Sequence, residues 1–441
     1  MFSRIIAWLK DGFFKSIIKN SLTLITGNVG ASILGSVSLV ISIKFLGLET
    51  FGVFTIVQTY VRIFDGLLNF QSWETIIRLG SEAQSKKDYK LLKSYIKQGF
   101  ILDICSAILG TVVAFVSVGF IGSRMGWDAD LIFLTRLMCL IIAFNIAGTP
   151  IGILRLFRKY KTFSFQKIIS AVIKLVGVII AYILKGDLFS FIIITMVADI
   201  SGYLILIYMG YKTLKENSFR DIWSSPLLDK KEFLKFSLWS NINSTLSLPV
   251  REMDKIIVSL ISFEAVGVYK LFKQIMSIIG KVVTPIYQTI YPELAKFISE
   301  KKYKKAVSIS KRIGVIMLAV GIPLLLILAS TSFIWLKWII GFQSIHYCLV
   351  LSFFLFTKVF SNAFIGVNPL FVSAGYIKYN FFIIIIASIL YLSLAYFLVL
   401  RIGLLGIVIA SFAEIVWSYG VKIVILSRDN RFIRRRTCYK L

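Results

Sequence analysis

Apolar runs of about 20 residues recur along the whole chain. A helix of about 20 residues crosses the hydrocarbon core of a bilayer, which is about 30 Å thick. Of the 441 residues, 57% are hydrophobic and 16% are charged, whereas about a quarter of the residues in soluble domains are charged. The sequence therefore predicts an all-α polytopic membrane protein.

Twelve transmembrane helices can be placed on these runs. The predicted spans lie near 21–45, 51–78, 98–121, 130–154, 164–184, 188–211, 236–261, 264–292, 311–335, 345–371, 379–400 and 402–427.

A weak internal repeat divides the twelve spans into two sets of six. Glu49–Phe54 (ETFGVF) matches Glu264–Tyr269 (EAVGVY), and Pro150 with Lys159-Tyr160 later matches Pro369 with Lys378-Tyr379. Because six is an even number, both halves have the same orientation. The repeat predicts two six-helix bundles related by a pseudo-two-fold axis along the membrane normal, with a central cavity between them.

These patterns also predict the limits of the segments. An interfacial amphipathic helix is expected first, because apolar and charged residues alternate there at helical spacing. The basic tail is expected to rest on anionic lipid headgroups. In chain order the segments are 1–20 (interfacial helix), 21–211 (first bundle), 212–235 (cytoplasmic linker), 236–427 (second bundle) and 428–441 (tail).

The distribution of Lys and Arg predicts the orientation. If the N-terminus is cytoplasmic, the cytoplasmic segments hold 34 Lys and Arg and the opposite loops hold 4. Cytoplasmic loops of membrane proteins collect these residues, so both termini are predicted to be cytoplasmic. The same effect accounts for the net charge of +28 without a nucleic-acid partner.

Charged residues inside the spans are the candidates for function. Twelve Lys and Arg lie there against seven Asp and Glu, not counting Asp130 and Glu264 at the first positions of their spans. A charge at membrane depth costs about 3 kcal/mol, and structural pairing does not require an excess of cations. The excess favours a cationic, water-accessible cavity for an anionic substrate. Lys422 lies near a span end, where its ammonium is expected to reach the interface.

The second predicted span carries a polar stripe. At 100° per residue, five polar side chains lie on one side of the helix: Gln58, Arg62, Asp65, Asn69 and Ser72. Arg62 and Asp65 are i, i+3 neighbours and are expected to pair. Glu74 and Arg78 form a second expected pair, at i, i+4.

Similar stripes occur in the seventh and eighth predicted spans. In the seventh, Pro249 lies beside the stripe and is expected to free a backbone carbonyl one turn earlier. The polar residues are Ser240, Ser244, Ser247, Arg251 and Lys255 in the seventh span, and Lys270, Ser277, Lys281, Thr284 and Gln288 in the eighth.

Catalytic motifs are absent from the sequence. It has neither a phosphate-binding Walker loop nor a GxSxG nucleophile motif, and its single histidine, His346, has no cluster of metal-ligand residues around it. We therefore expect no enzyme activity, no metal and no organic cofactor.

Two stretches carry a resemblance to a known family. Phe45–Ala83 and Leu248–Lys296 resemble the polysaccharide flippases of the multidrug/oligosaccharidyl-lipid/polysaccharide exporter (MOP) superfamily. The resemblance implies alternating access by two bundles in a bacterial inner membrane. It also implies transfer of an undecaprenyl-diphosphate-linked oligosaccharide to the outer leaflet for O-antigen, capsule or exopolysaccharide synthesis, alongside a polysaccharide polymerase and chain-length machinery.

The stripes supply candidate contacts for such a substrate. Arg62 and Arg251 are predicted to bind the diphosphate, and Lys255, Lys270 and Lys281 to extend the cationic surface. Hydroxyl and amide groups are predicted to meet sugar hydroxyls, namely Gln58, Asn69, Ser244 and Ser247. Asp65 is a further candidate of the cavity. Either Asp65 or Glu74 is a candidate for coupling transport to H⁺ or Na⁺.

Two other functions compete with this one. A cation-coupled exporter of small molecules or drugs from the same superfamily would favour an acidic cavity, which is opposite in charge to the cavity expected here. A membrane polymerase or ligase would need a large outer loop for its catalytic groups, whereas the predicted outer loops are all short, the longest being about 122–129.

Overall fold

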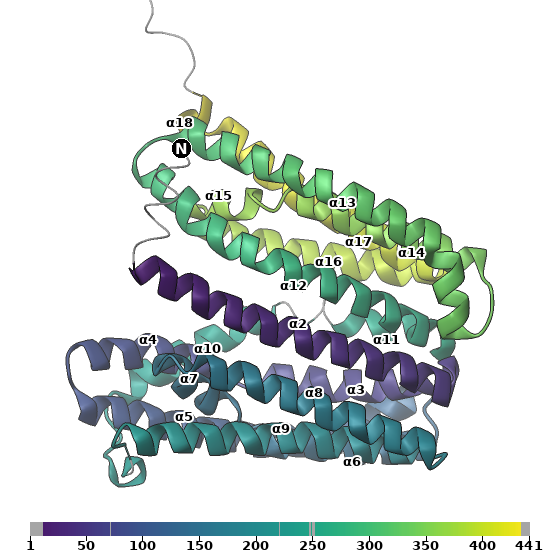
Figure 1. The fold of residues 1–441 in the computed structure, drawn as a ribbon, viewed down its shortest axis with the longest axis horizontal. Helices are drawn as coiled ribbons and strands as arrows, with labels where there is room; N and C mark the ends of the chain where they lie inside the picture. Colours follow the sequence, from purple (N-terminus) through teal and green to yellow (C-terminus); the bar gives the residue numbers. More distant parts are fainter. Residues whose placement is uncertain (1–11, 71, 220, 247, 249–251, 434–441) are drawn as a thin grey trace, which may run out of the picture. The chain divides into compact units, whose positions relative to one another are not determined.

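The computed structural model describes residues 12–433, with gaps at 71, 220, 247 and 249–251. All regular secondary structure in the described residues is helical (Figure 1). The chain divides into two compact units between Leu248 and Pro249.

The first unit is built from long helices that lie side by side. In it, α2 lies along α8, and α8 lies along α9 (Figure 1). Its helices are α2 (Gly12–Leu46), α3 (Leu48–Leu68), α4 (Ser72–Ser85), α5 (Tyr89–Arg124), α6 (Ala129–Phe144), α7 (Gly148–Leu156), α8 (Tyr160–Ile183), α9 (Leu188–Glu216), the 3-10 turn η1 (Ile222–Ser224) and α10 (Lys230–Thr245).

The second unit has the same kind of construction. In it, α13 packs against α14, and α16 packs against α17. Its helices are α11 (Asp254–Ser259), α12 (Phe263–Ser299), α13 (Tyr303–Ile340), α14 (Ile345–Ala363), α15 (Val367–Ser373), α16 (Ile377–Ile402), α17 (Leu404–Arg428) and α18 (Asn430–Ile433).

Ten spans among the described residues, each made of one helix or of two consecutive helices, are long and apolar enough to cross a membrane. They coincide with predicted spans one to six and nine to twelve, and the predicted all-helical membrane fold is confirmed. Apolar side chains on their outer surfaces are exposed, for example Val116 at 69% and Ile334 at 73%. In water such surfaces would be unfavourable, but in a bilayer they face lipid.

The seventh and eighth predicted spans differ from this pattern. The seventh contains α10, which ends at Thr245, and α11, which begins at Asp254, whereas residues 247 and 249–251 between them lie outside the described part of the chain. The eighth corresponds to α12, whose lysines lower its hydropathy.

Residues 12–20, predicted to lie in an interfacial helix, form the first turns of α2, whereas residues 1–11 lie outside the described part of the chain. The predicted segment limits stay a prediction.

A polar segment joins α9 to α10 and is fastened to α5. The Lys93 ammonium donates to both carboxylate oxygens of Asp221 at 2.9 Å. This hydrogen bond holds the pKa of Asp221 below its usual value. Farther along α5, Lys97 donates to the carbonyl of Trp223, and Gln98 donates to that of Leu228.

α10 packs into the first unit through both apolar and polar contacts. The Phe233 ring is fully buried in a core with Ile76, Leu92 and Ile96 of α4 and α5. This packing explains why α10 belongs with the helices that precede it. It also brings Ser240 of α10 to the Glu74 carboxylate of α4.

Close backbone contact between α13 and α14 depends on Gly314. A Cβ atom at this position would lie 2.2 Å from the Ala363 carbonyl oxygen. Replacing Gly314 with Ala should therefore push the helices apart and lower the free energy of unfolding by about 1–3 kcal/mol, measured as a lower melting temperature of the purified protein in detergent. Gly420→Ala on α17 is the matched control, because no atom lies within 4 Å of a Cβ atom there. A G314A protein that melts at or above the wild-type temperature contradicts this account of the helix contact.

Candidate functional site

The polar stripe predicted on span two is interrupted by a break in the helix. α3 ends at Leu68, and the backbone N–H of Asn69 donates to the Asp65 carbonyl as its cap. Ser72 then begins α4 and is fully buried, so it does not continue the stripe. Gln58 is 6% exposed, whereas Arg62 is exposed on α3.

A second break lies beside the first. α6 ends at Phe144 and α7 begins at Gly148, and Asn145 between them reaches across to α3. Its side-chain amide donates to both carboxylate oxygens of Asp65, at 2.8 and 2.9 Å, and the Asn69 amide donates to Asp65 at 3.4 Å. Two interrupted helices are thus joined through one carboxylate.

The predicted ion pair between Arg62 and Asp65 is absent from the part of the chain that the structure describes. Amide groups hold the Asp65 carboxylate instead. The Arg62 guanidinium is left exposed. It can therefore meet an anion without first giving up an ion pair with Asp65.

The expected pairing of Glu74 with Arg78 is replaced by contacts to α10. The Ser240 hydroxyl donates to the Glu74 carboxylate, and the Arg78 guanidinium lies over the Phe236 ring, 4.6 Å from its centre. Between them, the Thr75 and Ser237 hydroxyls are 2.9 Å apart and both residues are buried. Glu74 is therefore part of the joint between α4 and α10.

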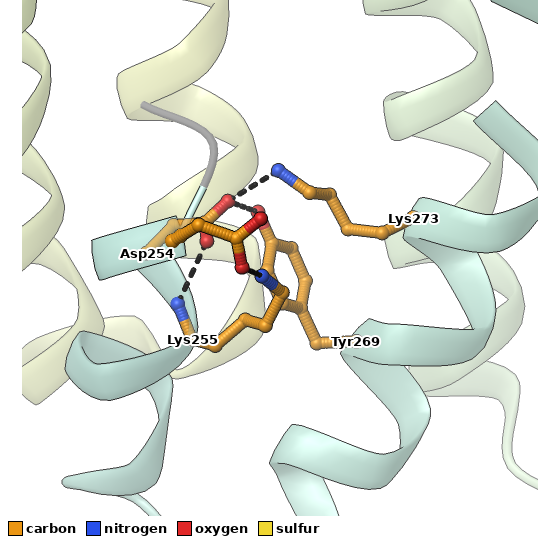
Figure 2. Close-up of polar contacts among 5 residues, drawn as sticks. Asp254, Lys255, Tyr269 and Lys273 are labelled. Carbon is orange, nitrogen blue, oxygen red and sulfur yellow. Dashed lines mark hydrogen bonds and ion pairs between the residues drawn. The ribbon is translucent and has the colours of Figure 1, made fainter. Parts of the chain in front are cut away.

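The second unit contains a buried charged cluster where α11 meets α12 (Figure 2). Asp254 is 0% exposed, and its carboxylate accepts hydrogen bonds from the Tyr269 hydroxyl at 2.7 Å and the Lys273 ammonium at 2.5 Å. Lys255 donates to the Glu252 carboxylate at 2.5 Å. Removing one member of such a buried set leaves an uncompensated charge.

The cluster changes the interpretation of Lys255. Only 3% of the Lys255 side chain is exposed, and its ammonium is held by Glu252. Lys273 keeps 27% of its side chain exposed while it binds Asp254. Of these two lysines, Lys273 is the more accessible to a ligand.

A basic stripe follows α12 from this cluster. Lys270, Lys273 and Lys281 recur at helical spacing and are all partly exposed. Lys358 of α14 joins them, because its ammonium lies 3.9 Å from the position of a Cβ atom on Gly280. We call these four lysines the α12 basic stripe.

The remaining predicted residues of span seven are divided between the two units. Ser244 lies in α10 and is partly buried, whereas Lys255 lies in α11. Ser247 and Arg251 lie outside the described residues. Asn145, Tyr269, Lys273 and Lys358 are absent from the predicted site, although Lys273 follows Lys270 by three residues and continues the predicted stripe of the eighth span.

The described helices define a multi-pass membrane protein. A family model described as "Polysaccharide biosynthesis protein" (Polysacc_synt) matches residues 17–298. The chain belongs to this family. It is also 22% identical over 294 residues to the inner membrane protein YghQ of Escherichia coli strain K12, covering 66% of this chain and 83% of YghQ.

Solved structures share the fold at low sequence identity. An inward-facing multidrug resistance MATE transporter of the MOP superfamily superposes with a TM-score of 0.70 at 16% identity, covering 92% of this chain and 94% of that one. The lipid II flippase MurJ in an inward closed conformation gives 0.69 at 15% identity, covering 92% and 87%. A MOP transporter of Pyrococcus furiosus gives 0.65 at 15% identity, covering 94% and 96%. The fold is therefore the one found in MOP-superfamily transporters.

Proposed function

We propose that this protein moves a lipid-linked oligosaccharide, carried on undecaprenyl diphosphate, from the cytoplasmic to the outer leaflet of a bacterial inner membrane. Its family is described as one of polysaccharide biosynthesis, and MurJ, which shares the fold, is a lipid II flippase. The proposed product feeds the synthesis of O-antigen, capsule or exopolysaccharide.

The observation that carries the proposal is the α12 basic stripe. Three lysines of α12 and Lys358 of α14 place four cationic groups along one part of the second unit. Such a concentration of charge within a membrane-spanning protein is expensive unless it serves a ligand or a pathway. A diphosphate carries about two negative charges and is a suitable ligand for ammonium groups.

The exposed Arg62 adds a guanidinium in the first unit. Its planar fork of N–H donors matches phosphate oxygens better than an ammonium does. We therefore retain Arg62, and with it Lys270 and Lys281, as substrate contacts. Lys273 and Lys358 are added to them.

The proposed direction of transfer follows from charge. With both termini cytoplasmic, as the Lys and Arg distribution predicts, an inside-negative potential assists outward movement of an anion by about 2.3 kcal/mol per charge per 100 mV. Coupling to H⁺ or Na⁺ through Asp65 or Glu74 stays a prediction.

Deletion of the gene tests the proposal directly. The expected result is loss of one surface polysaccharide together with accumulation of its undecaprenyl-linked repeat unit on the cytoplasmic side, measured by lipid extraction and mass spectrometry. Restoration by the plasmid-borne gene is the control. Unchanged surface glycans and unchanged lipid-linked intermediates in the deletion strain refute the proposal.

The alternative function is export of small molecules, and the shared fold with MATE transporters favours testing it. The basic stripe is opposite in charge to a site for cationic drugs. Altered drug resistance in a deletion strain with intact surface glycans would favour the exporter instead.

A further inference from the structure

A second polar site lies inside the second unit and is lined by residues outside the α11–α12 charged cluster. It is a cavity of about 340 Å³ bounded by residues of α12, α14, α15, α16 and α17. A cavity of this size is within the range of small-ligand pockets. Its polar lining includes Tyr287, Asn368, Glu414, Ser418 and Lys422.

One side of the cavity is a chain of hydrogen bonds that spans three helices. The Lys422 ammonium of α17 donates to the Asn368 side-chain oxygen of α15 at 2.8 Å. The Asn368 amide in turn donates to the Tyr287 hydroxyl of α12 at 3.1 Å. Lys422 is only 5% exposed, so the expectation that it reaches the membrane interface is wrong. Its bond to Asn368 directs it inward.

The other side of the cavity carries a carboxylate. Glu414 precedes Lys422 by eight residues on α17, about 12 Å along the helix axis at 1.5 Å per residue. Within the described part of the chain, no hydrogen bond or ion pair is found to the Glu414 carboxylate. Glu414 is partly exposed, so its carboxylate can accept hydrogen bonds from a ligand in the cavity.

The mixture of charges selects the kind of ligand. A diphosphate would be repelled by Glu414, and a simple cation would be repelled by Lys422. A neutral, hydroxyl-rich group fits both, because each hydroxyl can donate to the carboxylate and accept from the ammonium or an amide.

Apolar surface completes the fit. The Tyr419 ring lines the cavity and is stacked on Phe364, with ring centres 5.5 Å apart. Ile365, Ile384 and Ile415 also line it. A sugar ring presents both hydroxyl groups and an apolar C–H face, so it matches hydrogen-bonding groups on one side and an aromatic or aliphatic wall on another.

We propose that this cavity binds one sugar residue of the transported oligosaccharide. The inference rests on the proposed function, because it assigns the sugar part of that substrate to residues other than the basic groups assigned to its diphosphate. Glu414 and Asn368 orient the hydroxyls, and Tyr419 supports the ring.

Binding is tested on the purified full-length protein with free monosaccharides as probes. The panel is D-glucose, D-galactose, N-acetyl-D-glucosamine and D-mannose, and the readout is the melting temperature in detergent, because a ligand that binds the folded state raises it. At least one sugar should raise the melting temperature of the wild type. The shift should be lost in Asn368→Ala and Glu414→Gln and kept in Ser393→Ala, which alters a different, mainly apolar cavity on α16.

The same variants are tested in cells by complementing a deletion strain. Loss of one neutral hydrogen bond should slow outer-leaflet delivery of the glycolipid about fivefold in N368A, at wild-type protein abundance. The proposal is overturned if no sugar of the panel raises the melting temperature, or if the shift in N368A and E414Q equals that of the wild type.

This design separates the two proposals. If deletion leaves the surface glycans and lipid-linked intermediates unchanged, the proposed function fails whatever the melting temperatures are. If deletion blocks delivery while N368A and E414Q behave as wild type in both assays, the sugar site alone fails.

Discussion

Replacing Arg62 with Ala is expected to slow delivery of the lipid-linked oligosaccharide to the outer leaflet by about 10- to 100-fold. The estimate follows from a hydrogen bond to a charged group, which contributes about 1.5–3 kcal/mol. Arg62 is exposed and Asp65 is held by Asn145 and Asn69, so the substitution removes a ligand contact without breaking the joint between the helices. The measurement is the ratio of surface glycan to cytoplasmic lipid-linked repeat unit.

Two further variants sharpen the Arg62 experiment. Arg62→Lys keeps the charge but loses the planar fork, and an intermediate rate is expected. Arg401→Ala, which removes an exposed arginine at the end of α16, should leave the rate unchanged. An R62A protein at wild-type abundance that delivers glycolipid at the wild-type rate would remove Arg62 from the site.

Replacing Asp254 with Ala is expected to destabilise the second unit by about 3–5 kcal/mol. The substitution leaves the partly buried Lys273 ammonium without its carboxylate partner. The Tyr269 hydroxyl also loses its acceptor. The measurements are the melting temperature in detergent and the amount of protein in the membrane. Combining Asp254→Ala with Lys273→Met should recover part of the loss, since the second change removes the unpaired charge.

The matched control for Asp254 is an exposed pair. Lys302 donates to Glu300 at 2.7 Å near the surface, and exposed ion pairs contribute little to stability. Glu300→Ala should therefore leave the melting temperature unchanged. If D254A melts at the wild-type temperature, the cluster in Figure 2 is not a structural support of the unit.

The transmembrane helices were predictable because each span is recognised from the hydropathy of its own consecutive residues. Ten of the twelve predicted spans correspond to helices of sufficient length and apolarity. The break after Leu68 was not predictable in this way, because Asn69 and Phe70 carry no proline signal. The break is accompanied by a contact with Asn145, which is 80 residues from Asp65.

In the candidate site too, the grouping of neighbours on one helix could be predicted, whereas contacts between different helices could not. Helical periodicity grouped Lys270 and Lys281 of α12 but left out Lys273, which follows Lys270 by three residues. It paired Arg62 with Asp65 and Glu74 with Arg78 because it considers only neighbours on one helix. In the folded protein, Asn145 and Ser240 approach from other helices and bind the two carboxylates instead.

The paired breaks in the first unit have a consequence for hydration. Each helix end leaves backbone N–H and C=O groups without helical partners, and lipid cannot bond to them. Side chains satisfy some of these groups, as when the Thr149 N–H at the start of α7 donates to Asp103 at 2.6 Å. Other groups bond to the backbone, as when the Asn145 N–H donates to the Ile142 carbonyl, and for any group left over we expect a water molecule near Asp65 to be the partner.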